Sequence, residues 1–224
     1  TFTGWIPWGL WTPSCRRGIQ LFLKTVLTVS RSSLLLLVSG PAGSGKTTLC
    51  ERLLHDFGPK LQRVITSTTR EPREGESDGV DYHFLSEAEF QEKLLAGEFY
   101  ESAQVHSGCY GTLKSSIQDQ LTEDVDLVLN IDVQGAASFR EIAMVDPVLR
   151  GQLVTVFIQP ISTQQIQDRL EGRGKDSPEE IERRLVTAQL EISHRDYFDH
   201  VIKSGTKEED YQAFRAIYEV ERGI

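Results

Sequence analysis

Residues Leu34–Leu54 read LLLLVSGPAGSGKTTLCERLL. The apolar run Leu34–Val38 has the length of a buried strand, and the apolar positions of Thr47–Phe57 recur at helical spacing. Between them, Gly40–Thr47 matches the pattern G-x-x-x-x-G-K-[ST]. Glycines let successive backbone N–H groups turn toward a polyphosphate, and the N-terminus of the helix adds positive charge. A strand, a glycine loop and a helix in this order therefore predict a nucleotide-phosphate site.

The residues of the glycine loop have distinct predicted roles. The ammonium of Lys46 can lie across the β- and γ-phosphates of ATP, and the hydroxyl of Thr47 can bind Mg²⁺. The loop alone fits a kinase, a GTPase or a motor. The residues predicted to bind ATP are Gly40, Pro41, Ala42, Gly43, Ser44, Gly45, Lys46, Thr47 and Thr48.

The bulk composition limits the class of protein. The chain has 224 residues, of which 39% are hydrophobic, which is enough for one core with small inserted lobes. Its net charge of −9 argues against nucleic acid or an anionic membrane as a partner, so local cations must bind any anionic ligand. Cys15, Cys50 and Cys109 follow no disulfide or metal-site spacing, which favours a reducing, cytoplasmic location.

Residues 1–33 differ from the rest of the chain, because they hold all three tryptophans and no acidic residue. A segment that contains Arg and Ser but no acids is typical of organelle transit segments, and Trp beside Arg suits a membrane interface. A poorly ordered extension without a targeting role is the alternative. Lys24 and Arg31 interrupt the apolar run Gly18–Val38, so we expect no membrane-spanning helix and no stable membrane insertion.

From Leu34 onward, short apolar runs alternate with segments of helical periodicity, which is typical of a parallel sheet covered by helices on both faces. We therefore expect one α/β unit over residues 34–224, similar to P-loop NTPases. The further predicted strands are Arg63–Thr66, Val125–Ile131, Leu153–Ile158 and Val201–Ile202. The further predicted helices are Ser86–Ala96, Thr163–Glu171, Pro178–His194 and Glu208–Arg222.

Residues 67–111 interrupt this alternation and are rich in Gly, Tyr, Glu and Arg. The segment has little helical pattern before Glu87, and we expect an inserted lobe rather than a linker. Its aromatic side chains are frequent enough to build a small core of its own. The predicted members of that core are Tyr82, Phe84, Phe90, Phe99 and Tyr110.

The run TSTTREPREGE, residues 66–76, places two arginines on either side of a proline that stiffens the chain. The guanidinium groups of Arg70 and Arg73 can each bind a phosphate monoester with two hydrogen bonds. Tyr82 and Tyr110 lie nearby in the sequence and can add hydroxyl donors. The sequence therefore predicts a monophosphate site, although a solvated loop of alternating charges is an alternative.

This run closely resembles guanylate kinase when it is read with four later motifs, GVDYHF (79–84), GEFYE (97–101), YGT (110–112) and NIDVQGA (130–136). The motifs follow the family's order and spacing from about Leu34 to the C-terminus. The resemblance implies Mg²⁺-dependent transfer of the γ-phosphoryl group of ATP to GMP or dGMP, with residues 67–111 as the GMP-binding lobe.

The resemblance also implies roles for single residues. Arg70, Arg73, Tyr82 and Tyr110 would hold the GMP phosphate, and Thr66, Glu101, Thr112 and Asp132 would hold guanine. The chemistry agrees, because guanine presents N1–H and a 2-amino group as adjacent donors to a carboxylate such as Glu101, whereas adenine has an acceptor at N1. Without the resemblance, Glu101 could be a surface acid and Asp132 a strand-end cap.

A second concentration of cations lies in residues 161–185, which resemble the lid of nucleoside monophosphate kinases. Gly172 and Gly174 permit hinge movement, so that arginines can close over the transferring phosphoryl group and exclude water. An exposed helix with a Glu180–Arg184 ion pair is the alternative. The predicted catalytic residues are Lys46, Arg70, Arg169, Arg173 and Arg184.

Three positions depart from the family's pattern. Asn130 stands where relatives usually carry an acid, which puts the Mg²⁺ or phosphate-side network in doubt. Thr66 replaces the more usual Ser and keeps the hydroxyl. The usual V-N-D pattern of the adenine pocket is absent around Ile202–Gly205, which leaves selectivity for ATP open.

Two other functions remain open at this point. Guanylate-kinase-like domains of scaffold proteins bind phosphorylated peptides without turnover, but such domains typically degrade the glycine loop, and here Gly45, Lys46 and Thr47 are intact. A kinase for AMP, UMP or CMP fits the glycine loop but not the acceptors Glu101 and Asp132. We expect a monomer or a homodimer, with organelle location as the alternative to cytoplasm if residues 1–33 are a transit segment.

Overall fold

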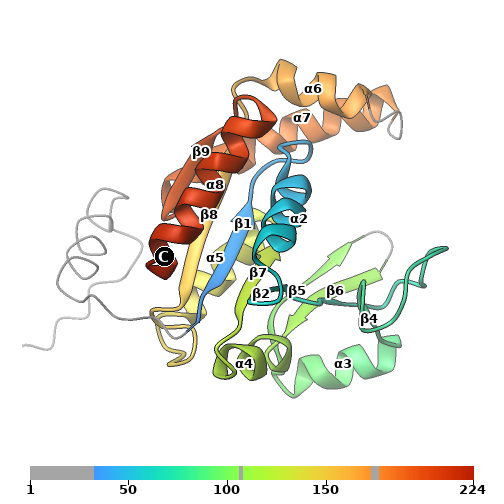
Figure 1. The fold of residues 1–224 in the computed structure, drawn as a ribbon. Helices are drawn as coiled ribbons and strands as arrows, with labels where there is room; N and C mark the ends of the chain where they lie inside the picture. The colour runs from blue at the N-terminus through green and yellow to red at the C-terminus, as the bar shows by residue number, and fades with distance from the viewer. Residues whose placement is uncertain (1–32, 106–107, 173–176) are drawn as a thin grey trace, which may run out of the picture. The chain divides into compact units, whose positions relative to one another are not determined.

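The computed structural model describes residues 33–105, 108–172 and 177–224. Its main sheet has five strands in the order β2-β7-β1-β8-β9, and every neighbouring pair is parallel (Figure 1). The α/β class predicted from the sequence is confirmed. The strands are β1 (Leu35–Ser39), β2 (Leu61–Arg63), β7 (Asp126–Asn130), β8 (Leu153–Gln159) and β9 (His200–Lys203).

Helices cover both faces of this sheet. One face lies under α2 (Lys46–Phe57) and α8 (Lys207–Arg222), and the other lies under α4 (Ser115–Thr122) and α5 (Val133–Ile142). Strand β1 is central and fully buried, because Leu36 and Val38 pack into the first core while Leu35 and Leu37 pack into the second. A strand covered on both faces needs apolar residues at every position, which explains the unbroken apolar run.

Strand β2 differs from the predicted strand Arg63–Thr66, which is wrong in both of its bounds. The strand begins at Leu61, which pairs with Asp126, and it ends at Arg63. Val64 still donates from its backbone N–H to the carbonyl of Val128, at 3.0 Å, and its side chain is buried against the second core. Val64 is therefore apolar because it packs against the second core directly after β2 ends, and not because it belongs to the strand.

Helices α4 and α5 were not predicted. Helix α4 is short and buries only Ile117 and Leu121, which is too few for a clear helical period. Helix α5 contains Gly135, a weak helix former. A Cβ at that position would lie 2.4 Å from Cδ1 of Ile131, so the glycine permits a close approach that sequence patterns do not reveal.

A second, four-stranded sheet has the order β4-β3-β6-β5. Strands β5 and β6 are antiparallel, and α3 packs on this sheet through Phe90, Phe99 and Leu113. Helix α3 starts at a capping box formed by Ser86 and Glu89. The elements are β3 (Ser67–Thr68), β4 (His83–Phe84), α3 (Glu87–Leu95), β5 (Phe99–Val105) and β6 (Gly108–Leu113).

The aromatic core predicted for this lobe is only partly correct. Phe90 and Phe99 stack with their ring centroids 4.5 Å apart. Tyr82, Phe84 and Tyr110 are half-buried and lie outside that core, because the alternation of side chains along short strands turns them toward the arginine described below.

Two further helices pack against each other and against the glycine loop. Helix α6 (Thr163–Glu171) and α7 (Pro178–Ser193) share a small core of Ile166, Leu170 and Ile181, and Ala42 of the loop packs against it (Figure 1). A short 3₁₀ turn, η2 (Arg195–Tyr197), follows α7. No helix in the described ranges is long and apolar enough to cross a membrane.

Asp126 ties the start of β7 to two other parts of the chain. Its buried carboxylate accepts hydrogen bonds from the backbone N–H of Leu34 at 2.9 Å, from the hydroxyl of Tyr218 at 2.6 Å and from Nε of Arg222 at 2.7 Å. Burial raises the pKa of this carboxyl, and the donors act in the opposite direction. Such a charge is stabilising only while its partners remain.

We therefore expect Asp126→Asn to lower the free energy of unfolding by about 3 kcal/mol, because it leaves Arg222 facing an amide. Tyr218→Phe removes one hydrogen bond and should cost about 1 kcal/mol. Urea unfolding measures both values. Equal losses in the two variants would contradict the view that the charge of Asp126 organises this corner.

Candidate active site

The glycine loop joins the carboxyl end of β1 to the start of α2. Gly40 has a φ of 142°, and a Cβ at this position would lie 2.4 Å from the carbonyl oxygen of Ile158 in β8. A residue other than glycine would therefore push the loop off the sheet. Gly45 precedes α2 with a φ of 99°, which only glycine adopts without strain.

Two polar side chains of the loop point to a binding role. The ammonium of Lys46 donates to the carbonyl oxygens of Gly40 and Pro41, at 2.5 and 3.0 Å, so it lies over the loop. The hydroxyl of Ser44 is buried and has no hydrogen-bond partner among the described residues. A buried polar group without a partner in the described residues needs an explanation, and a bound anion would supply one.

Thr47 and Asn130 meet at the carboxyl end of the sheet. Thr47 is the second residue of α2, and its side chain is exposed. Asn130 ends β7, and its Nδ2 lies 3.4 Å from Oγ1 of Thr47. The position that departs from the family's pattern therefore touches the residue predicted to bind the metal. A hydroxyl and an amide oxygen are acceptable ligands for Mg²⁺, which also takes phosphate oxygens and water.

An arginine cluster lies on the second sheet. The side chain of Arg70 is only 9% exposed, and its Nε donates to the hydroxyl of Tyr110 at 3.3 Å. Its guanidinium carbon lies 5.5 Å from the ring centroid of Tyr82, and the rings of Tyr82 and Tyr110 are 6.1 Å apart. The structure thus brings together three of the four residues predicted to hold a phosphate monoester.

Glu76 organises this cluster and was missed as a site residue. Its carboxylate accepts from Nη2 of Arg70, with contacts of 3.0 and 2.9 Å, and from the backbone N–H of Arg73 at 2.8 Å. The side chain of Arg73 is exposed. The bond to the N–H of Arg73 and the ion pair with Arg70 hold the pKa of Glu76 below its ordinary value. The sequence signal that could have identified Glu76 was its place three residues after Arg73, from which its carboxylate can reach the backbone N–H of that residue.

Glu101 lies in β5 directly opposite Thr112 in β6, and Oγ1 of Thr112 donates to its carboxylate at 2.6 Å. Burial raises the pKa of Glu101, the bond from Thr112 opposes that shift, and the negative charge of Asp132 adds to it. Glu101 is half-buried, so it is not the surface acid of the alternative interpretation. The structure therefore joins Glu101 and Thr112 of the predicted guanine site by a hydrogen bond.

Asp132 has a second contact that fits the alternative interpretation. It is the N-cap of α5, and its Oδ1 accepts from the backbone N–H of Gly135 at 2.8 Å. A cap occupies one carboxylate oxygen, so the two roles are compatible. Thr66 is half-buried just before β3, and in the described part of the chain no hydrogen bond joins it to Glu101.

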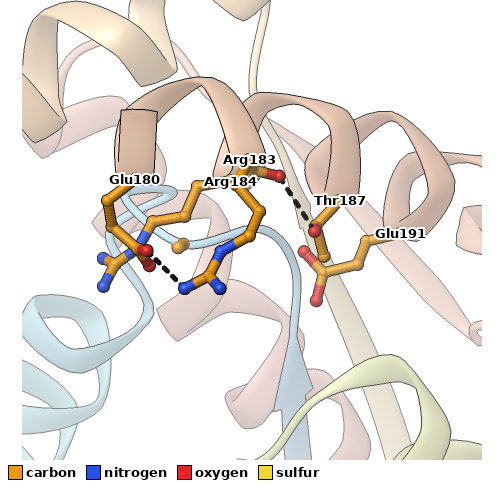
Figure 2. A pocket seen from close by; sticks show the side chains of 6 residues that line it. Glu180, Arg183, Arg184, Thr187 and Glu191 are labelled. Carbon is orange, nitrogen blue, oxygen red and sulfur yellow. Dashed lines mark hydrogen bonds and ion pairs between the residues drawn. The ribbon is translucent and has the colours of Figure 1, made fainter. Parts of the chain in front are cut away.

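The helices α6 and α7 bring arginines to the glycine loop. Nη1 of Arg169 lies 3.2 Å from the carbonyl oxygen of Gly43 and 3.3 Å from that of Ser44. Arg184 donates from Nε to Glu180 at 3.0 Å, so the ion pair of the alternative interpretation is present (Figure 2). Arg183 also pairs with Glu180. The predicted catalytic residue Arg173 lies outside the described residues.

An open cavity of about 340 Å³ separates α7 from the loop and is lined by Ala42, Glu180, Arg183, Arg184, Thr187 and Glu191 (Figure 2). Burial raises the pKa of Glu191, the positive charge of Lys46 lowers it, and the negative charge of Asp132 raises it further. Glu191 therefore shares this cavity with Ala42 of the glycine loop. Glu191 belongs to none of the motifs identified in the sequence.

The glycine loop has the geometry to bind one polyphosphate. The separate cluster of Arg70, Tyr82 and Tyr110 has the donors to bind a second phosphate group. The negative charge of Asp132 acts both on Glu191, which lines the cavity beside the loop, and on Glu101, which accepts from Thr112. A P-loop fold that combines the loop and the cluster defines a nucleoside monophosphate kinase.

Comparison with known proteins narrows the class to one family. A family model described as guanylate kinase matches residues 32–221. The guanylate kinase of Methylobacillus flagellatus is 41% identical over 188 residues, which cover 84% of this chain and 89% of that protein. The guanylate kinase of the Wolbachia of Brugia malayi is 38% identical, covering 88% and 97%. The crystal structure of guanylate kinase from Anaplasma phagocytophilum superposes with a TM-score of 0.62 at 30% identity, covering 86% and 87%. This chain belongs to the guanylate kinase family.

The environment of Glu101 gives a direct prediction for its titration. Asp132→Asn should lower the pKa of Glu101, because a neighbouring negative charge is removed. Thr112→Val should raise it, because the ionised form loses a hydrogen bond. Carboxyl ¹³C chemical shifts followed against pH measure both changes, with Glu74, an exposed acid, as the internal reference. Shifts in the same direction for both variants would contradict this arrangement.

Proposed function

We propose that this protein transfers the γ-phosphoryl group of MgATP to GMP or dGMP, giving ADP and GDP or dGDP. The half-buried carboxylate of Glu101 carries the proposal, with the buried Thr112 donating to it and the negative charge of the exposed Asp132 acting on it. Membership of the guanylate kinase family supports the same reaction.

Guanine recognition would rest on the ionised carboxylate of Glu101. That carboxylate can accept from N1–H and the 2-amino group of guanine, while Asp132 and the hydroxyls of Thr66 and Thr112 add further contacts. Adenine would place an acceptor against the same carboxylate. The resulting loss of a hydrogen bond at a buried charge disfavours AMP strongly. The residues therefore favour GMP over AMP, UMP and CMP.

The phosphate of GMP would lie against Arg70, Arg73, Tyr82 and Tyr110. Arg70 is preorganised by Glu76 and Tyr110, so little conformational entropy is lost when it binds. The exposed Arg73 would complete the site when the monophosphate binds. The lobe of residues 67–111 thus holds the acceptor.

ATP would occupy the loop from Gly40 to Thr48, with Lys46 on the β- and γ-phosphates. Thr47, with Asn130 beside it, would hold Mg²⁺, which supplies positive charge to the phosphates when bound. Asn130 is neutral, so the protein offers this ion less negative charge than an acid would. The loop and Arg169 together hold the donor.

The reaction would need positioning and charge neutralisation rather than a covalent intermediate. A phosphate oxygen of GMP is already nucleophilic, so no general base is required. Arg169, Arg173 and Arg184, from residues 161–185, would close over the transferring group and exclude water, which otherwise would hydrolyse ATP. The alternative, an inactive phosphopeptide-binding module, has no use for Lys46 and Arg169 on an intact loop.

Release of ADP from MgATP with GMP, dGMP, AMP, CMP or UMP supplied in turn tests the proposal. We expect turnover with GMP and dGMP only. Lys46→Ala should lower kcat by about 100-fold or more while GMP binding persists. Glu101→Gln should reduce the preference for GMP over AMP by about 100-fold.

Two results would reject the proposal. One is ADP release with GMP that does not exceed the control without acceptor, which would favour the binding module. The other is an unchanged preference for GMP in Glu101→Gln, which would show that the guanine assignment is wrong.

The role of Glu76 gives a separate prediction. Glu76→Ala should raise KM for GMP by about tenfold, because Arg70 loses the partner that fixes it, while KM for ATP stays the same. Glu74→Ala is the matched control, since Glu74 is an exposed acid two residues away. Equal effects of the two variants would assign the change to the charge of the loop rather than to the position of Arg70.

A further inference from the structure

The turn between β9 and α8 carries a buried acid that the reaction described above does not use. Asp210 is 5% exposed and lies in the first turn of α8, whose N-cap is Thr206. Ser204 directly follows β9 and is fully buried. Its backbone N–H donates to the carbonyl oxygen of Gln159, the last residue of β8, at 2.8 Å. This is the segment in which the V-N-D pattern is absent.

Ser204 and Asp210 form a hydrogen-bonded pair with a fixed direction. The hydroxyl of Ser204 donates to Oδ2 of Asp210 at 2.6 Å, and the backbone N–H of Gly205 donates to Oδ1 at 2.6 Å. A carboxylate only accepts, so the single proton of the hydroxyl must point at Asp210. The lone pairs of Ser204 are then available on its other side.

Arg169 lies on that side. Its Nη2 is 3.4 Å from Oγ of Ser204, while its Nη1 contacts the carbonyl oxygens of Gly43 and Ser44. The guanidinium is planar, so fixing one nitrogen on Ser204 fixes the plane in which the others face the glycine loop. Asp210 also places a negative charge behind the arginine, one hydroxyl away.

We propose that Ser204 and Asp210 are positioning residues that orient Arg169 on the glycine loop and so set the affinity for the donor nucleotide. The inference rests on the proposed function, in which Arg169 contacts that donor. Through the pair, the start of α8 and the end of β9 become part of the ATP site without touching ATP.

The direction of the hydrogen bond allows a sharp substitution. In Asp210→Asn, Oδ1 must still accept from the N–H of Gly205, since that N–H cannot accept. The amide NH₂ then faces Ser204, so the hydroxyl proton of Ser204 loses its acceptor, and the negative charge behind Arg169 is removed. The hydroxyl of Ser204 is then no longer held in one direction, and Arg169 loses its fixed acceptor although the shape of residue 210 is unchanged. Ser204→Ala removes the acceptor for Arg169 with a smaller change at Asp210.

We expect Asp210→Asn and Ser204→Ala to raise KM for ATP, and the Kd of a non-hydrolysable ATP analogue, by about tenfold, with KM for GMP unchanged. In an Arg169→Ala background the same substitutions should have no further effect on ATP. A loss in that background equal to the loss in the wild-type background would overturn the proposal, because the two residues would then affect ATP binding independently of Arg169.

Asp199→Asn is the matched control. Oδ2 of Asp199 accepts from both the backbone N–H and the hydroxyl of Thr155, each at 2.9 Å, near the start of β8 and away from the loop. This variant should lower the melting temperature while leaving KM for ATP unchanged. A wild-type protein without GMP-dependent turnover would reject the proposed function. Active wild type with unchanged analogue binding in Asp210→Asn and Ser204→Ala would reject only the present inference.

Discussion

Strand β1 lies between two hydrophobic cores and holds both the main sheet and the glycine loop in position. Leu35 and Leu37 pack on one side of the sheet and Leu36 and Val38 on the other, so the strand cannot shift without opening both cores. The loop that follows inherits this rigidity, because Gly40 lies against the carbonyl of Ile158 in the neighbouring strand. The parallel arrangement also brings Asn130 beside Val38, at the same edge. A rigid sheet edge thus positions the residues proposed for the donor nucleotide.

The sequence predicted those parts of the molecule that follow local rules. The central strand is a continuous apolar run, and α2, α6 and α7 have strong helical periodicity. Their predicted bounds lie within a few residues of the observed ones. Helix α5 was not predicted because it contains Gly135, a weak helix former. That glycine is needed for a close approach to Ile131, which exists only in the folded chain. Glu76 and Asp210 escaped for a similar reason. Their roles come from hydrogen bonds to Arg70 and Ser204, and the hydrogen-bond partner of an acid cannot be read from its spacing.

Carboxylates that position arginines recur around the candidate site. Glu76 holds Arg70, Glu180 holds Arg184, and Asp210 acts on Arg169 through Ser204. A free arginine side chain has many rotamers, and ordering it costs free energy when a phosphate binds. An acid that accepts from the far side of the guanidinium lowers this cost in advance. It also leaves nitrogens on the near side for the ligand, because a guanidinium has five N–H groups.

The same arrangement explains how a chain with a net charge of −9 can bind two polyanions. Long-range attraction is of little help, because at physiological ionic strength charges are screened beyond about 8 Å. Each phosphate must instead meet cations at hydrogen-bond distance, and those cations must not already be neutralised on the side that faces the ligand. Glu191 and Glu101 are acids that depend on a nearby positive charge or on hydrogen-bond donors. Burial raises the pKa of both acids and so disfavours their ionised forms. A nearby cation, or a donor edge such as that of guanine, acts in the opposite direction and stabilises the ionised forms. The acidic balance of the chain therefore includes groups that hold arginines in place and, in the proposed function, a group that would select the base.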